Sequence, residues 1–347
     1  MHEAITALLD HGDGPGPDGW RSLWDRLEDG ALDRAEVAVL LTALAVRLPD
    51  GRTLRDLVAS LRERAPAVTG SWPGSVNIVG SGGGPGTFNI STAAAFVAAA
   101  MGVPVVKTGS RAYTSVAGSV DLLDRLGIGL TTSPAHTEDA LERFGIAFAG
   151  QYVYPPVLTR LARSILPLSV RPFGRFFNTV GPFLPALPVT AQVTGVSRRV
   201  PLAGLRELAR AVTDRTIWLC ANDLGADELI GFADNTIYPN DGHEPIRLPS
   251  GTLTTGGTLD DLRPATDPGS LTAHFLDVVS GAGNETATQT VCLNAAALAV
   301  AGGHLLDWHE AMDAALDAVH SGAARALLDR VRAQRTGRTR SPAVAHG

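Results

Sequence analysis

Lysine is almost absent from this chain. Lys107 is the single lysine among 29 basic residues, and the other 28 are arginines. Such a bias replaces lysine with arginine wherever only a surface charge is needed, but a guanidinium cannot always stand in for a compact, strongly hydrated ammonium. The surviving lysine is therefore a candidate functional residue. The alternative is a lysine that merely lies exposed at the end of a strand.

Cysteine, long apolar runs and excess positive charge are also scarce. Cys220 and Cys292 are too few and too far apart in the sequence for a disulfide framework or a CxxC metal site, which favours a reducing compartment. We find no secretory leader pattern and no uninterrupted apolar run of about 18 residues. The formal net charge of −6 argues against a nucleic-acid binder. We expect a cytoplasmic protein that binds neither membranes nor nucleic acid.

The composition is that of a globular protein with one large or two modest domains. Of the 347 residues, 45% are hydrophobic and 18% are charged. We predict a helical domain over residues 1–70, an α/β domain over 71–335 and a flexible tail over 336–347. Residues 171–188 are rich in proline, phenylalanine and glycine. They are predicted to form a hinge or crossover near the helical domain, without a helix.

Helical periodicity dominates the first 70 residues. Asp33, with Glu36 three residues later, fits a capping-box start for one helix, and residues 51–64 are expected to form another. Apolar residues recur at helical spacing, which indicates packing: Trp20, Leu23, Trp24 and Leu27, then Val37, Leu40, Leu41, Leu44 and Leu48.

The residue pattern changes after Trp72, from helical periodicity to alternating strands and helices. A buried strand over 76–79 leads into a glycine-rich segment, then a helix that begins near Ser91, then a strand over 103–106. This order is typical of a parallel α/β sheet. Further strands are expected at 146–148, 191–194, 216–219 and 229–231, and amphipathic helices at 202–211 and 285–301.

Residues 80–86 contain five glycines directly after the first strand. Their backbone N–H groups can converge on an anion, and the following helix N-terminus adds unsatisfied N–H donors and a favourable dipole, with the hydroxyls of Ser91 and Thr92 beside them. The segment predicts a phosphate or pyrophosphate cradle; a tight glycine turn with Ser/Thr caps is the alternative. It is not a P-loop, because no Gly-Lys-Ser/Thr follows, and Pro85 breaks a dinucleotide fingerprint.

Lys107 follows the second strand of this unit. The carboxyl ends of parallel strands share one edge of a sheet, where ligands bind. We therefore expect the lysine to point toward the same anion as the glycine segment.

Several motifs together resemble the anthranilate phosphoribosyltransferase family, and the resemblance covers most of the chain. It is carried by Gly80-Ser-Gly-Gly83, Thr87-Phe-Asn-Ile-Ser-Thr92, Lys107-x-Gly-x-Arg111, Ser115, Gly118-Ser119, Phe177-Asn178 and Asp227-Glu228. The resemblance implies a small N-terminal α-helical domain plus a larger α/β domain with a central, mostly parallel sheet. It also implies a homodimer, phosphoribosyl pyrophosphate as the donor substrate and Mg²⁺ as the cofactor.

The resemblance also implies roles for individual residues. Ser91, Asp227 and Glu228 would bind the metal, although without the resemblance the acidic pair is only an acidic turn. Lys107 would stabilise the leaving pyrophosphate, on which negative charge develops as the bond to the ribose breaks. The implied donor-binding residues are Gly80, Ser81, Gly82, Gly83, Thr87, Asn89, Ser91, Thr92, Lys107, Ser115 and Ser119.

The departures from the family pattern lie on the acceptor side. The family has His and Asn where Thr108 and Ser110 stand, and an arginine where a straight count reaches Leu168, so that Arg171 could serve only with a shifted register. The glycine segment is one residue shorter than the family's, and Ala221-Asn222 replace a His-Gly. The predicted acceptor-binding residues are Thr108, Ser110, Arg111, Tyr113 and Arg171.

These departures predict an acceptor other than anthranilate. Residues 223–267 hold nine carboxylates and two arginines, which suits a cationic acceptor, although a solvated acidic loop is the alternative. The leading candidate is a hydroxyl of an aminoglycoside of the neamine or paromamine type, in antibiotic biosynthesis. A hydroxyl needs a base, for which Asp121, Asp223 and the departing pyrophosphate are candidates. Anthranilate transfer and a non-catalytic donor-binding relative remain alternatives.

Overall fold

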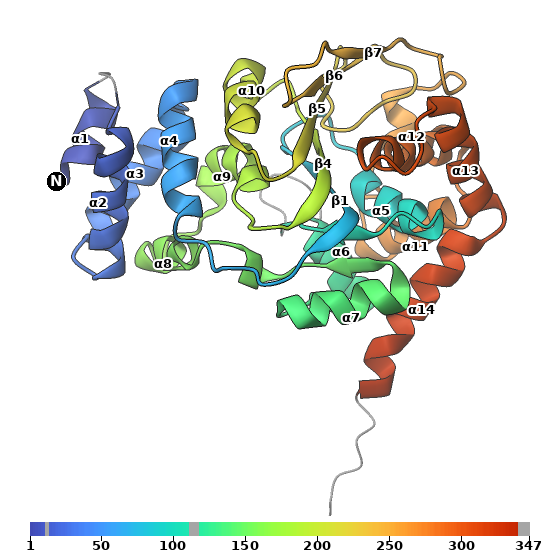
Figure 1. Cartoon of the computed structure of the whole chain (residues 1–347), viewed down its shortest axis with the longest axis horizontal. Coiled ribbons are helices and arrows are strands. Elements are labelled where there is room, and N and C mark those ends of the chain that lie inside the picture. The colour runs from blue at the N-terminus through green and yellow to red at the C-terminus, as the bar shows by residue number, and fades with distance from the viewer. Residues whose placement is uncertain (11–13, 111–117, 339–347) are drawn as a thin grey trace, which may run out of the picture.

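The computed structural model describes residues 1–10, 14–110 and 118–338. It confirms the α/β class, with a seven-stranded sheet and an N-terminal group of helices. Figure 1 shows α1–α4 gathered at one end of the molecule, with α5 and α11–α14 at the other side of the sheet. No helix in the described part of the chain is long and apolar enough to cross a membrane.

The N-terminal helices are α1 (Glu3–Leu9), α2 (Gly16–Glu28), α3 (Arg34–Val46) and α4 (Gly51–Arg62). The predicted apolar face of α2 is buried, and the capping box of Asp33 with Glu36 starts α3 as expected. Helix α4 ends two residues before the predicted end. Helix α1 was not predicted; the ring nitrogen Nδ1 of His2 accepts from the N–H of Ala4 and caps it.

The sheet has the strand order β3-β2-β1-β4-β5-β6-β7. Strands β1 to β5 run parallel to one another, whereas β6 and β7 are antiparallel additions that sequence patterns did not reveal. Gly80, at the end of β1, pairs with Gly195, at the end of β4, so these two ends meet at the same edge. The bounds are β1 (Trp72–Gly80), β2 (Val105–Lys107), β3 (Ile146–Phe148), β4 (Val189–Gly195), β5 (Thr216–Asn222), β6 (Asn235–Pro239) and β7 (Ile246–Leu248).

The strand predicted at 229–231 was wrong. This buried segment is irregular, and two side-chain amides take the place of neighbouring strands. Asn294 accepts from the N–H of Leu229 at 3.1 Å and donates to its carbonyl at 2.8 Å. Asn235 does the same for Ile230, at 2.9 and 2.7 Å. Buried backbone groups must be paired, and here side chains rather than a ladder pair them.

Helices surround the sheet. Two of them, α10 and α12, match the predicted bounds residue for residue, and α12 packs against α5 and α13. The predicted tail is partly helical, because α14 continues to Arg338; residues 339–347 lie outside the described residues. The bounds are α5 (Ile90–Ala100), α6 (Ser119–Leu126), α7 (Pro134–Phe144), α10 (Leu202–Ala211), α11 (Pro268–Val279), α12 (Glu285–Ala301), α13 (Trp308–His320), α14 (Ala323–Arg338) and the 3₁₀ turn η4 (Leu259–Leu262).

Residues 171–188 do contain a helix, contrary to the prediction. The 3₁₀ turn η2 (Arg171–Phe173) leads into α9 (Gly174–Val180), and the 3₁₀ turn η3 (Gly181–Phe183) follows; upstream lie the 3₁₀ turn η1 (Gln151–Val153) and α8 (Pro156–Ser164). Phe176 and Val180 are buried against the N-terminal helices. Their burial supplies the stabilisation that the local composition lacks.

Two large apolar cores stabilise the sheet and the helices around it. One lies around α5 and α12, and the other lies among the N-terminal helices, α8 and α9. The second core also contains residues of α10 and β5, so the helical layer packs directly on the α/β part. The predicted domain boundaries stay a prediction. Cys220 and Cys292 are buried free thiols.

Candidate active site

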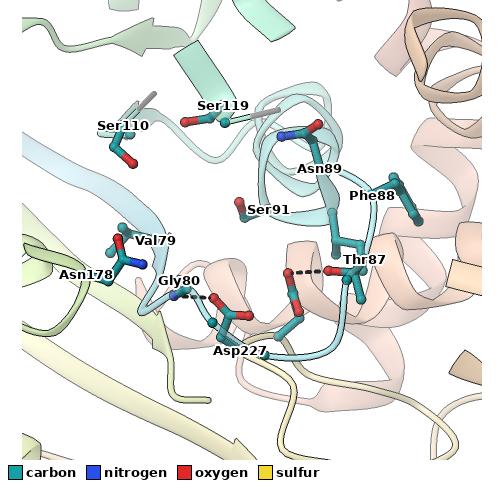
Figure 2. A pocket seen from close by; sticks show the side chains of 18 of the residues that line it. Val79, Gly80, Thr87, Phe88, Asn89, Ser91, Ser110, Ser119, Asn178 and Asp227 are labelled. Carbon is teal, nitrogen blue, oxygen red and sulfur yellow. Dashed lines mark hydrogen bonds between the residues drawn. The ribbon is translucent and has the colours of Figure 1, made fainter. Parts of the chain in front are cut away.

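A cavity of about 370 Å³ opens at the carboxyl ends of β1 and β2 (Figure 2). The glycine loop after β1, the first turn of α5, the start of α6 and the loop after β5 form its wall. This is the edge at which parallel sheets bind ligands. The predicted site residues that line it are Gly80, Gly82, Gly83, Thr87, Asn89, Ser91, Lys107, Thr108, Ser110, Ser119, Asp227 and Glu228.

The glycine loop forms its part of the wall from backbone alone. Gly82 and Gly83 have φ angles of 65° and 80°, in the left-handed region that favours glycine. A Cβ atom on Gly82 would lie 2.5 Å from Nδ2 of Asn178, and one on Gly80 would collide with the carboxylate of Asp227. The N–H of Gly82 donates to Oδ2 of Asp227 at 2.6 Å, so the acidic pair anchors the loop.

Lys107 lies in the cavity wall, and its side chain is buried rather than exposed. Its Nζ donates to the carbonyl of Ile78 at 2.8 Å, to Oγ of Ser91 at 3.3 Å and to the carbonyl of Thr108 at 3.4 Å. Burial lowers the pKa of Lys107 to about 7, while the charge of Glu228 acts in the opposite direction. A lysine with such a pKa gains its charge when an anion arrives beside it.

Asp227 and Glu228 follow β5 through a turn that Asn222 shapes. The Nδ2 of Asn222 donates to the carbonyl of Glu228 at 2.8 Å, and its Oδ1 accepts from the N–H of Ala226 at 3.1 Å. Burial is the largest cause that raises the pKa of both carboxyl groups, and the charge of Asp227 raises that of Glu228 further. One of the family departures, Asn222, therefore builds the turn that presents the acidic pair.

The acidic pair fits a hard divalent cation such as Mg²⁺. The hydroxyl of Thr87 donates to Oε1 of Glu228 at 3.1 Å, whereas Oε2 is buried without a hydrogen-bond partner. A buried, unpartnered carboxylate oxygen is costly unless a cation or proton joins it. No group of three His, Cys, Asp or Glu side chains is placed to hold a metal among the described residues. Mg²⁺ needs only one or two carboxylates when water and substrate phosphates complete its shell.

Four predicted residues with described side chains do not line this cavity: Ser81, Thr92, Asp121 and Asp223. Ser81 accepts from the N–H of Ser197 at 2.9 Å, and the hydroxyl of Thr92 is buried within α5 without a partner. The carboxylate of Asp121 accepts from the N–H of Gly118 at 2.9 Å at the start of α6. Their placement gives no support to a donor contact by Thr92 or to Asp121 as the base.

The predicted acceptor residues are only partly described. Thr108 and Ser110 line the cavity. Arg111 and Tyr113, like the predicted donor residue Ser115, fall in 111–117, which lies outside the described residues. Arg171 begins η2, and its side chain lies outside the described part. Leu168, which stands in the place of the family's arginine, does not line the cavity.

A buried polar network forms the floor beneath Thr108. Asn77, on β1, accepts from the N–H of Thr108 at 3.0 Å and donates to its hydroxyl at 3.1 Å and to Oε1 of Gln192 at 3.1 Å. Gln192, on β4, donates to the carbonyl of Pro182 at 3.0 Å. The network joins β1, β4 and the residue that follows β2 to η3, the turn directly after α9, and Asn77 engages the hydroxyl of Thr108 within the protein.

Sequence reasoning missed two lining residues with polar side chains, Asn178 and Arg199. Asn178 belonged to a quoted motif without a role. Arg199 stands four residues after Gly195, where β4 ends. The rule that located Lys107, a polar residue just after a parallel strand, would have found this arginine as well.

Comparisons with known proteins agree with this geometry. Residues 73–325 match the family described as "Glycosyl transferase family, a/b domain". The anthranilate phosphoribosyltransferase of Methylorubrum extorquens is 32% identical over 326 residues, which cover 90% of this chain and 92% of that one. The chain belongs to the anthranilate phosphoribosyltransferase family. The Geobacillus kaustophilus enzyme of the same name is also 32% identical, with 88% and 90% of the two chains covered.

Solved structures extend the agreement to the fold of this phosphoribosyltransferase. The crystal structure of the Thermus thermophilus anthranilate phosphoribosyltransferase has a TM-score of 0.75 and 28% identity, and covers 97% of this chain and 100% of its own. The Saccharomyces cerevisiae enzyme "in complex with PRPP and Mg" has a TM-score of 0.80 at 20% identity, with 96% and 97% covered, and supports the fold alone.

Proposed function

We propose that this phosphoribosyltransferase moves the 5-phosphoribosyl group from phosphoribosyl pyrophosphate to anthranilate, with Mg²⁺, and releases pyrophosphate. One observation carries the donor half: the glycine loop, the single lysine and the buried acidic pair meet in one cavity at the strand ends. The acceptor half rests on the relatives, which are named for anthranilate.

The residues suit the charges that develop when the bond between ribose and pyrophosphate breaks. Negative charge grows on the leaving group, where Lys107 can place an ammonium and the glycine loop can offer N–H groups. The donor's own negative charge favours the protonated form of Lys107, so donor binding itself charges the lysine. Asp227 and Glu228 would hold the magnesium, with Ser91 beside them; the ion would neutralise charge on the pyrophosphate.

An aminoglycoside hydroxyl is the second candidate acceptor. It is favoured by Thr108 and Ser110, which line the cavity where the family has His and Asn. The acidic segment that suggested a cationic acceptor does not support it, because Asp227 and Glu228 are its only carboxylates among the described lining residues. Six of the others are engaged in their own loops, in hydrogen bonds or ion pairs: Asp223, Asp234, Asp241, Asp260, Asp261 and Asp267.

Pyrophosphate release tests the proposal. The protein is incubated with phosphoribosyl pyrophosphate and Mg²⁺, without an acceptor and with either anthranilate or paromamine. Release with anthranilate supports the proposal, and release with paromamine alone replaces anthranilate by the second candidate. Calorimetric binding of the donor without turnover of any acceptor indicates the non-catalytic alternative. Absence of Mg²⁺-dependent donor binding contradicts the donor half as well.

Two further expectations accompany this function. We expect a homodimer, as the resemblance implies, and sedimentation of the full chain checks it; a monomer at micromolar concentration contradicts it. A cytoplasmic location likewise stays a prediction, which fractionation of the source cells tests.

A further inference from the structure

A second cavity, of about 440 Å³, lies beside the first cavity, the one proposed to bind the donor, and the glycine loop borders both. The two share four lining residues: Gly82, Gly83, Asn178 and Arg199. A molecule in the second cavity therefore lies against the same loop as the donor. In Figure 2 the side chain of Asn178 stands beside the start of this loop, near Gly80.

The second cavity is lined by arginines. Arg175 comes from α9, and Arg198 and Arg199 come from the segment between β4 and α10. No aspartate or glutamate is among its described lining residues. The segments on either side of β4 thus bring three positive charges to one opening, without a compensating carboxylate among its described lining residues.

Two of the three arginines are available to a ligand. The guanidinium of Arg198 donates to the carbonyl of Leu224, so it braces the loop that precedes the acidic pair. The side chains of Arg175 and Arg199 form no hydrogen bond or ion pair with any residue that the structure describes. The side chain of Arg199 lies close to Gly83, with its Cδ 3.4 Å from the point where a Cβ of that glycine would stand. It therefore lies at the boundary between the two cavities.

This arrangement favours an oxyanion and opposes a polycation. Guanidinium groups bind carboxylates and phosphates through paired, charge-assisted hydrogen bonds, which gives both strength and orientation. Like charges repel a cationic acceptor at the same opening. An aromatic acid acceptor matches the cavity in charge, whereas an amino sugar with several ammonium groups does not.

We propose that Arg175 and Arg199 bind the carboxylate of the acceptor, and that they replace the arginine that family members have at the position of Leu168. The inference rests on the proposed function and deepens it, because it assigns acceptor specificity to two residues. The same guanidinium chemistry could serve a phosphate of the donor, so the experiment measures donor and acceptor separately.

The experiment uses Arg175→Met, Arg199→Met and the double variant in the full chain. Arg210→Met is the matched control, because Arg210 is exposed on α10 and lines neither cavity. Both test arginines are exposed, and we expect unchanged melting temperatures. Kinetics are measured with anthranilate, with its neutral amide 2-aminobenzamide and with varied phosphoribosyl pyrophosphate.

The double variant should raise KM for anthranilate on the order of tenfold to a hundredfold, the usual range when charge-assisted hydrogen bonds are lost. The preference of the double variant for anthranilate over 2-aminobenzamide should fall by a similar factor. Its KM for phosphoribosyl pyrophosphate should stay within about twofold of the wild-type value, and so should both KM values of the Arg210→Met control. A rise in the donor KM with an unchanged acceptor KM overturns the inference in favour of a phosphate site. Unchanged values for both substrates overturn it as well.

Calorimetric titration with anthranilate, in the presence of phosphoribosyl pyrophosphate and Mg²⁺, separates this inference from the proposed function. Binding that weakens in the double variant supports the inference even if no turnover occurs, in which case the proposed function alone fails. Turnover with anthranilate that is insensitive to both arginines leaves the function standing and overturns the inference. Binding of paromamine in place of anthranilate also overturns it.

Discussion

Burial of Lys107 should make the stability of this protein depend on pH in a way that one substitution removes. The pKa of Lys107 falls from the ordinary 10.5 to about 7, because its side chain is 3% exposed. Between these two values the unfolded chain binds a proton that the folded chain does not hold. Stability therefore rises with pH across this window, since the unfolded state binds more protons there.

The size of the effect follows from the two pKa values. Each pKa unit corresponds to about 1.4 kcal/mol, so at pH 7 the depressed pKa opposes folding by about 4 kcal/mol, and at pH 10 by about 1 kcal/mol. Lys107→Met keeps the length of the side chain and removes the titrating amine. The free energy of unfolding of the wild-type protein should rise relative to that variant by about 3 kcal/mol between pH 7 and pH 10.

Urea unfolding at pH 7, 8, 9 and 10 measures this difference. The charge of Glu228 also acts on Lys107, and that carboxyl group titrates as well. The comparison is therefore repeated in a background without this carboxylate, between Glu228→Gln and the Lys107→Met/Glu228→Gln double variant. The lost hydrogen bonds of Lys107 shift the variant curves by a constant amount and leave the pH slope. If the difference in free energy of unfolding between the proteins with and without Lys107 stays constant within about 1 kcal/mol from pH 7 to pH 10, in both backgrounds, the lowered pKa of Lys107 is refuted.

Three further substitutions test the site and its support. Lys107→Arg should lower kcat/KM for phosphoribosyl pyrophosphate on the order of a hundredfold in steady-state assays, because a larger, planar cation cannot occupy a buried ammonium site; near-wild-type kinetics contradict this. Gly82→Ala should weaken calorimetric donor binding and cost about 1–2 kcal/mol of stability, because φ is 65° and the new Cβ meets Asn178 at 2.5 Å; unchanged binding argues against a backbone cradle. Asn294→Leu should destabilise the protein by about 2–4 kcal/mol in urea unfolding, since the N–H and carbonyl of Leu229 lose their partner; a loss under about 1 kcal/mol contradicts that account.

Local patterns predicted the bounds of two helices, α10 and α12. Helix α10 is amphipathic as expected, whereas α12 is buried on most of its surface and packs against α5 and α13, so its stability comes from the core rather than from local pattern. Local patterns failed for the helix α9 and for the irregular segment at Leu229, which depend on contacts with distant parts of the chain. The first forms because its apolar face reaches the core of the N-terminal helices, and the second because the amides of Asn235 and Asn294 replace a strand neighbour. Contacts between distant segments override local propensity, and a single sequence does not display them.

The sequence also did not show which charged residues face a ligand. The acidic segment 223–267 suggested a ligand of opposite charge, but in the structure most of its carboxylates stabilise their own turns and helix starts, where short-range hydrogen bonds hold them. Conversely, nothing in the sequence pattern indicated that Arg175 and Arg199 lie together, because they stand on either side of β4 and meet only at the second cavity.

The sequence by itself determined the chemistry of the proposed donor site. It contained the glycine loop after a strand, the hydroxyls at the start of the next helix, the acidic pair and one lysine among 29 basic residues. Only the tertiary structure decided how that lysine behaves. Burial lowers its pKa to about 7, although the charge of Glu228 acts in the opposite direction. Residue type is written in the chain, whereas solvation and proximity are set by what folds around each residue.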